Sequence, residues 1–115
     1  MATKENLEAA FAGESQANRK YLAFAKKADD EGYPQVARLF RAAAAAETIH
    51  AHAHLRALDG IKGTAENLEV AKAGEAHESN VMYPEFIAEA EKEGNKRALI
   101  SFNNALAVEK VHFDL

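Results

Sequence analysis

Apolar residues recur along this chain at spacings of three and four, the period of a helix with one buried face. Glycine and proline interrupt the pattern at only a few places and divide it into four segments. The predicted helices run from about Thr3 to Gly32, from Pro34 to about Leu58, from Thr64 to Gly94, and from about Asn95 to the end.

Residue types at the segment ends support these boundaries. Thr3 and Thr64 are predicted N-caps, and Pro34 suits the first turn of a helix. Pro84 lies inside the third segment and should kink it, because it lacks an N–H and crowds the carbonyl group of Asn80. Four helices joined by short turns predict an all-α fold, a four-helix bundle forming one domain over residues 1–115, with hairpins at about 3–58 and 64–115.

The chain also resembles itself when it is shifted by 62 residues. Aligned pairs include Tyr21 with Tyr83, Phe24 with Phe86, Gly32 with Gly94, Phe40 with Phe102, Glu47 with Glu109 and His50 with His112. Near the start the shift is 61, where Gly13-Glu14 falls on Gly74-Glu75, so one residue separates the two registers. The domain is therefore predicted to be two copies of one helical hairpin.

Each predicted helix carries a carboxylate about midway along its apolar stripe. The stripes are Leu7, Phe11, Glu14, Tyr21, Ala25, Ala28; Val36, Phe40, Ala43, Glu47, His50; Leu68, Ala71, Glu75, Glu78, Met82, Phe86; and Leu99, Phe102, Leu106, Glu109, His112. An unpaired buried carboxylate is destabilising by several kcal/mol, and the stripes contain no lysine or arginine. Two metal ions would compensate the charge, and the E-x-x-H pairs ETIH and EKVH place two ligands on one face of a helical turn.

Composition narrows the chemistry of such a site. The 115 residues include no cysteine, so the ligands must be carboxylate oxygen and imidazole nitrogen. A formal charge of −4 argues against a nucleic-acid partner. No segment resembles a signal peptide or a membrane span, so we expect a soluble cytoplasmic protein without a membrane partner.

With these motifs in place, the chain resembles the rubrerythrin family, the peroxide-reducing branch of the ferritin-like proteins. The segments that carry the resemblance are AFAGESQANRKY, AAAETIHAHAH, AGEAHESNVMYPEF and VEKVH. Its most diagnostic residue is Glu78, which forms E-x-x-E with Glu75 and has Ala17 as its counterpart in the first hairpin. The resemblance implies a ferritin-like bundle and a non-haem di-iron peroxidase that reduces hydrogen peroxide to water.

The resemblance also implies roles for seven metal ligands. Glu47 and Glu109 would bridge two iron ions, Glu14 and Glu75 would be terminal, His112 would bind one ion permanently, and the other ion would move between Glu78 and His50. The oxidised pair would carry an oxo or hydroxo bridge, and manganese or zinc substitution stays open. Family members commonly carry a rubredoxin domain, which needs cysteines, so either an external donor such as a rubredoxin-like protein serves or the sequence is a piece of a longer chain.

Tyr21 and Tyr83 would either hydrogen-bond to a ligand carboxylate in support of catalysis or be core aromatics. His52 lies about 200° around its helix from His50 and should face away. His54 stays on the His50 stripe, and a role beside the ligands or at the bundle end is favoured over metal binding. His77 is expected at the surface or an interface.

The connection between the hairpins constrains the assembly. In a ferritin-type bundle the second and third helices run parallel, and the return spans ~33 Å at ~1.5 Å per residue. Leu58–Gly63 is six residues long and extends only ~20 Å. Either the third helix runs antiparallel to the second, or two chains exchange hairpins. We predict the second arrangement, a domain-swapped homodimer.

Two other functions stay open. One is iron oxidation or storage with O₂ as in ferritins, against which Glu78 counts. The other is a non-catalytic metal-binding module that holds zinc or manganese in the same ligands.

Overall fold

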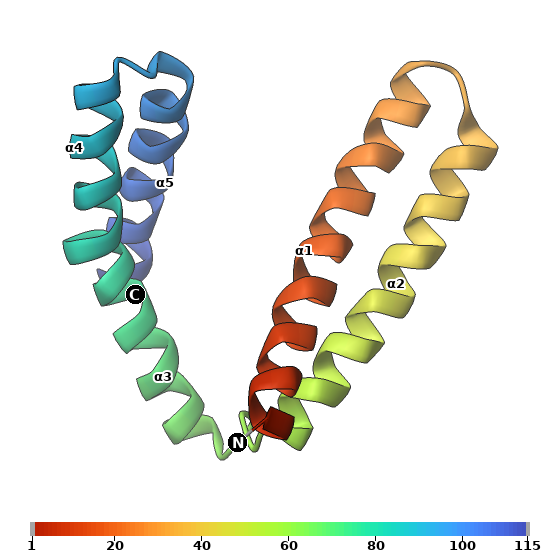
Figure 1. The fold of residues 1–115 in the computed structure, drawn as a ribbon, viewed down its shortest axis with the longest axis horizontal. Coiled ribbons are helices and arrows are strands. Elements are labelled where there is room, and N and C mark those ends of the chain that lie inside the picture. Colours follow the sequence, from red (N-terminus) through yellow and green to blue (C-terminus); the bar gives the residue numbers. More distant parts are fainter. Residues whose placement is uncertain (1, 115) are drawn as a thin grey trace. The chain divides into compact units, whose positions relative to one another are not determined.

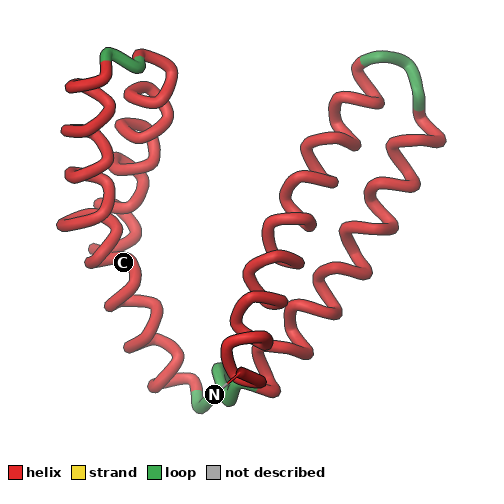
Figure 2. Tube along the Cα trace, viewed as in Figure 1, coloured by secondary structure: helices red, strands yellow, loops and turns green. Residues whose placement is uncertain are grey.

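The computed structural model describes residues 2–114, with side chains described as far as Glu109, and the described chain is helical apart from its connections (Figures 1 and 2). The elements are α1 (Ala2–Asp30), α2 (Pro34–Ala57), α3 (Thr64–His77), the π-helical turn η1 (Glu78–Met82), α4 (Tyr83–Glu93) and α5 (Lys96–Asp114). The prediction of an all-α chain is confirmed. No helix in the described range is both long and apolar enough to cross a bilayer.

The chain forms two compact units, Met1–Ile61 and Lys62–Leu115, which we call the first and second hairpins. In the first, α1 packs along α2; in the second, α4 packs along α5, and α3 and η1 also contact α5 (Figure 1). The boundary between the two units falls in the connection between α2 and α3. Each unit is a helical hairpin, and the single domain over residues 1–115 remains a prediction.

The two hairpin turns are built alike. Gly32 and Gly94 both have a left-handed backbone, with φ of 85° and 70°, a conformation that only glycine adopts without steric cost. The N–H of the residue after each glycine donates to the carbonyl oxygen five residues earlier, at 2.8 Å from Tyr33 and 3.0 Å from Asn95. This pattern is the Schellman motif, which closes the ends of α1 and α4 where the sequence predicted them to stop.

The helix starts differ in part from the prediction. Pro34 does open α2 in its first turn. Thr3 is not an N-cap, because α1 begins one residue before it. Thr64 is not one either, since Gly63 occupies that position and makes no side-chain cap. The linker is held instead by Asn67, whose side chain accepts from the Lys62 N–H at 2.9 Å and donates to its carbonyl oxygen at 3.0 Å.

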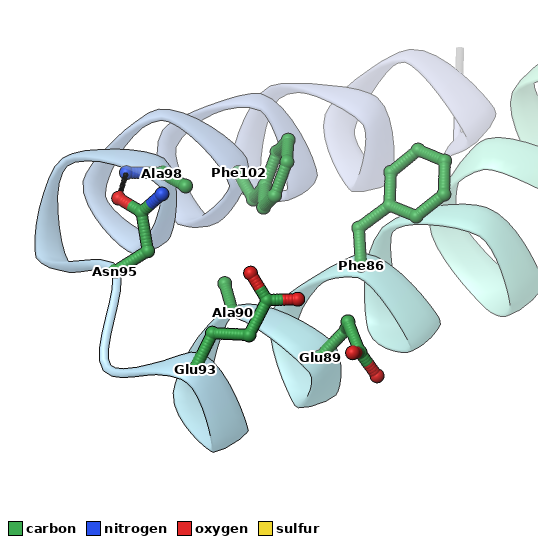
Figure 3. Close-up of a pocket in the computed structure, with 7 residues that line it drawn as sticks. All are labelled: Phe86, Glu89, Ala90, Glu93, Asn95, Ala98 and Phe102. Carbon is green, nitrogen blue, oxygen red and sulfur yellow. Dashed lines mark hydrogen bonds between the residues drawn. The ribbon is translucent and has the colours of Figure 1, made fainter.

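Asn95 is a side-chain cap at the start of α5. Its Oδ1 accepts a hydrogen bond from the Ala98 N–H at 3.0 Å (Figure 3). This bond satisfies one of the N–H groups that the first helical turn leaves without an internal partner. The predicted start of the fourth helix at about Asn95 is correct.

The third predicted helix is divided by η1, immediately before Pro84. Three residues separate Ala17 from Tyr21, whereas four separate Glu78 from Tyr83, so the one-residue change of repeat register falls on this turn. A π turn closes bonds from residue i to i+5 and thus holds one more residue than an α turn. The Tyr83 N–H makes such a bond to the Glu78 carbonyl oxygen. The interruption expected near Pro84 is present, and it takes the form of a π turn that absorbs the extra residue.

Three aromatic rings pack together in each hairpin. In the first, Tyr21, Phe24 and Phe40 have ring centroids 5.5 to 6.4 Å apart; in the second, Tyr83, Phe86 and Phe102 lie 5.5 to 6.2 Å apart. Each residue of one cluster is the counterpart of a residue of the other at the 62-residue shift. The sequence repeat is therefore also a repeat of packing.

Only small side chains are buried among the described residues. They are Ala25, Ala28, Ala37, Ala44, Ala51, Ser79 and Ala90. In contrast, Phe86 and Leu68 of the predicted stripes are 43% and 64% exposed, and Phe24 of the first aromatic cluster is 47% exposed. Alanines allow close approach of the helices within each hairpin, but neither hairpin by itself covers its large apolar side chains.

Candidate metal centre

The first hairpin brings three predicted ligands together. Glu14 lies on α1, and Glu47 and His50 lie on α2, one helical turn apart. Each offers one ligand atom, and these atoms all lie within 4.8 Å of one another. Both carboxylates are half-buried, while the His50 side chain is 56% exposed.

The second hairpin gathers three carboxylates in the same way. Glu75 at the end of α3, Glu78 at the start of η1 and Glu109 on α5 offer ligand oxygens within 4.8 Å of one another. All three are half-buried. The seventh predicted ligand, His112, is in α5 one turn after Glu109, and its side chain lies outside the described residues.

The donor set fits metal ions. The Oε2 atoms of Glu75 and Glu109 each expose less than 1 Å² to solvent. Carboxylate oxygens enclosed in this way favour a bound cation, because withdrawal of their charge from water is unfavourable. Oxygen and imidazole donors without thiolate suit iron and manganese, and imidazole also suits zinc.

The two clusters are not identical, and the difference lies at Glu78. Its counterpart in α1 is Ala17, so the first cluster has two carboxylates and His50 where the second has three carboxylates. Glu78 is also the first residue of η1, directly where the helix changes its hydrogen-bonding period. π turns inserted in α-helices occur frequently at functional sites.

The histidines of α2 take separate places. His50 Nδ1 lies 3.0 Å from Glu14 Oε1, and His54 Nε2 lies against Glu14 Oε2. His52 is exposed and lines a shallow groove with Phe11. Among the described ligand clusters His52 has no part, in accord with its predicted orientation.

Tyr21 and Tyr83 pack within the aromatic clusters described above. The hydrogen bonds predicted from these phenols to ligand carboxylates remain predictions. His77 is exposed, although it lies between Glu75 and Glu78 in sequence.

Asn18 is a residue that sequence reasoning missed. Its Nδ2 donates to the Ala44 carbonyl oxygen at 2.8 Å and to Thr48 Oγ1 at 2.7 Å, and so ties α1 to α2 beside Glu47. The Thr48 hydroxyl in turn donates to the same carbonyl oxygen at 3.1 Å. The available signal was an asparagine inside a helix, one turn after Glu14, where its helix propensity is unfavourable.

Comparisons with known proteins agree on one family. The family model described as Rubrerythrin matches residues 5–115. Nigerythrin of Nitratidesulfovibrio vulgaris is 42% identical over 96% of this chain and 62% of its own length. Rubrerythrin-2 of Clostridium acetobutylicum is 35% identical over 98% of this chain and 69% of its own, and rubrerythrin of Porphyromonas gingivalis is 40% identical over 96% and 62%. The chain thus spans about three fifths of the nigerythrin length.

Proposed function

This chain belongs to the rubrerythrin family, whose fold is ferritin-like, and from that membership we propose that it is a di-iron peroxidase that reduces hydrogen peroxide to water. The observation that carries the proposal is the pair of ligand clusters, one in each hairpin, built on residues that the repeat relates. Glu78 in the second cluster favours a peroxidase over a ferritin-type iron oxidase, because it is the carboxylate by which the rubrerythrin pattern differs.

We assign the ligand roles from the family pattern. Glu47 and Glu109 would each contact both ions, and Glu14 and Glu75 would each hold one. His112 would complete the ligand set of one ion. His50 would hold the other ion when it is reduced and Glu78 when it is oxidised, because neutral imidazole suits Fe(II) and an added anionic oxygen suits Fe(III).

The chemistry divides between the metal pair and the protein. When bound, two ferrous ions supply the two electrons that, with two protons, convert one peroxide molecule into two water molecules. The half-buried carboxylates would hold the ions and limit their contact with bulk water. Tyr21 and Tyr83 are proposed to orient ligand carboxylates, and an external donor such as a rubredoxin-like protein restores the reduced state.

We further propose that two chains exchange hairpins to form the complete bundle in a homodimer, with two metal sites. The connection Leu58–Gly63 has six non-helical residues, too few for the ~33 Å return of a ferritin-type bundle. The large apolar side chains that each hairpin leaves exposed support a partner as well.

The ends of the hairpins add a second argument for this assembly. In Figure 3, a groove between α4 and α5 is lined by seven residues, among them Phe86 and Phe102. The groove of the first hairpin is lined by the seven residues 62 positions earlier. At one pair of related positions the charge differs, since Lys27 of the first groove has Glu89 as its counterpart. The apolar floors suit a joint between the two types of groove, in which Lys27 can face Glu89, while the related residues Glu31 and Glu93 are acidic in both grooves.

Stopped-flow mixing of the anaerobic, iron-loaded reduced protein with hydrogen peroxide, and separately with O₂, tests the peroxidase function. The proposal predicts that peroxide oxidises the iron much faster than O₂ does, as followed by absorption of the ferric product. Equal rates, or faster oxidation by O₂, would reject the peroxidase and favour ferritin-like iron oxidation. Zinc-loaded protein is the inactive control for the ligand set, because Zn²⁺ has no redox chemistry.

A further inference from the structure

One imidazole near the first cluster is not used by the proposed ligand set. His54 lies one helical turn after His50 on α2, and both side chains contact the carboxylate of Glu14 on α1. The contacts are divided between the two oxygens: His50 Nδ1 lies 3.0 Å from Oε1, and His54 Nε2 lies against Oε2. The His54 side chain is 30% exposed and that of Glu14 is 25% exposed, so the contact is largely shielded from solvent.

Oε2 of Glu14 has no hydrogen-bond partner of regular geometry in this structure, and the imidazole nitrogen that lies against it is His54 Nε2. We propose that His54 is a positioning residue for the metal site: in the metal-loaded protein its Nε2–H donates to Oε2 of Glu14 and leaves Oε1 to bind the metal ion. The inference rests on the two-metal site of the proposed function, and it does not depend on peroxidase activity. Glu14 is then a ligand through one oxygen, with an orientation set by α2.

The spacing at the other oxygen agrees with this division. Two ligand atoms that bind one metal ion at ~2.1 Å and at a right angle lie ~3.0 Å apart. This is the separation of His50 Nδ1 and Glu14 Oε1. The separation of these two atoms is compatible with a shared ion, whereas Oε2 lies against His54.

His54 itself is not placed as a ligand. The ligand atoms that lie within 4.8 Å of one another in the first hairpin belong to Glu14, Glu47 and His50, and His54 is not among them. Carboxylate ligands of metal sites are commonly held by such a hydrogen-bond partner, and loss of the partner weakens metal binding by about 10- to 100-fold.

The consequence concerns the ion that moves in the proposed cycle. If that ion moves from His50 to Glu78, Oε1 of Glu14 no longer shares an ion with His50. The contact with His54 does not involve His50, so it can keep Glu14 in place through both states. His54 therefore allows one ligand to be exchanged while the neighbouring ligand stays fixed.

Anaerobic titration of the metal-free protein with Co²⁺ tests the inference, with binding heat and visible ligand-field absorption as readouts. The variants are His54→Leu, which removes the donor, and His54→Gln, which keeps an N–H donor but is a poor metal ligand. His52→Leu is the matched control, because it makes the same change at an exposed position on the same helix. Far-UV circular dichroism of each metal-free variant confirms that it is folded.

Wild-type protein should bind two Co²⁺ ions per chain. His54→Leu should weaken one of them by about 10- to 100-fold and lower its absorption intensity, as Glu14 turns to bind through both oxygens. His54→Gln should restore both properties, and His52→Leu should leave them unchanged. Unaltered binding in His54→Leu would overturn the inference, and so would equal losses in His54→Gln and His54→Leu, which would make His54 a ligand. Fewer than two ions in the wild type would reject the metal site and both proposals.

Discussion

Replacement of Phe24 by alanine should separate the chains of the proposed dimer. Phe24 is 47% exposed in the first hairpin and lines its end groove, which the exchanged hairpin of the partner is proposed to cover. A phenylalanine side chain offers about 200 Å² of surface, of which that fraction is about 90 Å². At about 25 cal/mol per Å² its burial contributes about 2 kcal/mol, and two copies contribute about 4.5 kcal/mol to the dimer.

Sedimentation equilibrium over a range of protein concentrations measures this effect. An energy of about 4.5 kcal/mol corresponds to an increase of about 10³-fold in the dimer dissociation constant. Leu39→Ala is the control, because Leu39 is 68% exposed and lies next to Phe40 on α2 but does not line the groove. Wild-type protein that is monomeric at micromolar concentration while holding two metal ions would refute the reasoning. Equal effects of the two substitutions would refute it as well.

Three further substitutions test the site and the hairpins. Glu78→Ala gives the second hairpin the residue that the first has at this position. Loss of a ligand's hydrogen-bond partner weakens a metal site by about 10-fold or more, so loss of this ligand should slow oxidation by peroxide at least as much in stopped-flow measurements. Gly94→Ala should lower the free energy of unfolding by about 1 kcal/mol because φ is 70° there, whereas Gly13→Ala, where an added Cβ meets nothing within 4 Å, should raise it by a similar amount in urea denaturation. Asn18→Ala should destabilise the metal-free protein by about 1 to 2 kcal/mol in the same assay, because the Ala44 carbonyl oxygen and Thr48 lose a donor; no change would show that the link from α1 to α2 is unimportant.

The helices and hairpin turns could be predicted because their causes are local. Gly32 and Gly94 end helices because the chain needs a residue with a left-handed backbone at those points. The helices themselves could be predicted because the spacing of apolar residues is visible in the sequence. Residue type alone predicted N-caps at Thr3 and Thr64, and the structure has neither. The start of α3 depends instead on contacts such as those of Asn67 with Lys62, which require the folded linker.

The register change illustrates a partial prediction. The alignment shows that one extra residue lies between Glu78 and Tyr83, but an insertion in a helix can be accommodated by a loop, a kink or a wider turn. Pro84 indicated an interruption, since it removes an N–H from the helix. The structure shows that a π turn accommodates both features and begins at Glu78 itself.

For the site, the sequence repeat groups the same residues that the folded hairpins bring together. Glu14, Glu47 and His50 form one cluster, and Glu75, Glu78 and Glu109 form the other, because helical spacing places each set on facing stripes of one hairpin. Helical periodicity predicted only that His54 lies on the same face of its helix as His50. Its contact with one particular oxygen of Glu14 depends on the distance between α1 and α2, which periodicity does not determine.

Mössbauer spectroscopy of protein loaded anaerobically with ⁵⁷Fe and then oxidised with one equivalent of hydrogen peroxide tests most directly whether the two clusters form one two-metal site. The account predicts two iron ions per chain, both ferric after the reaction, in an antiferromagnetically coupled pair with a diamagnetic ground state. Magnetically isolated ferric ions, or a single ion per chain, would contradict it.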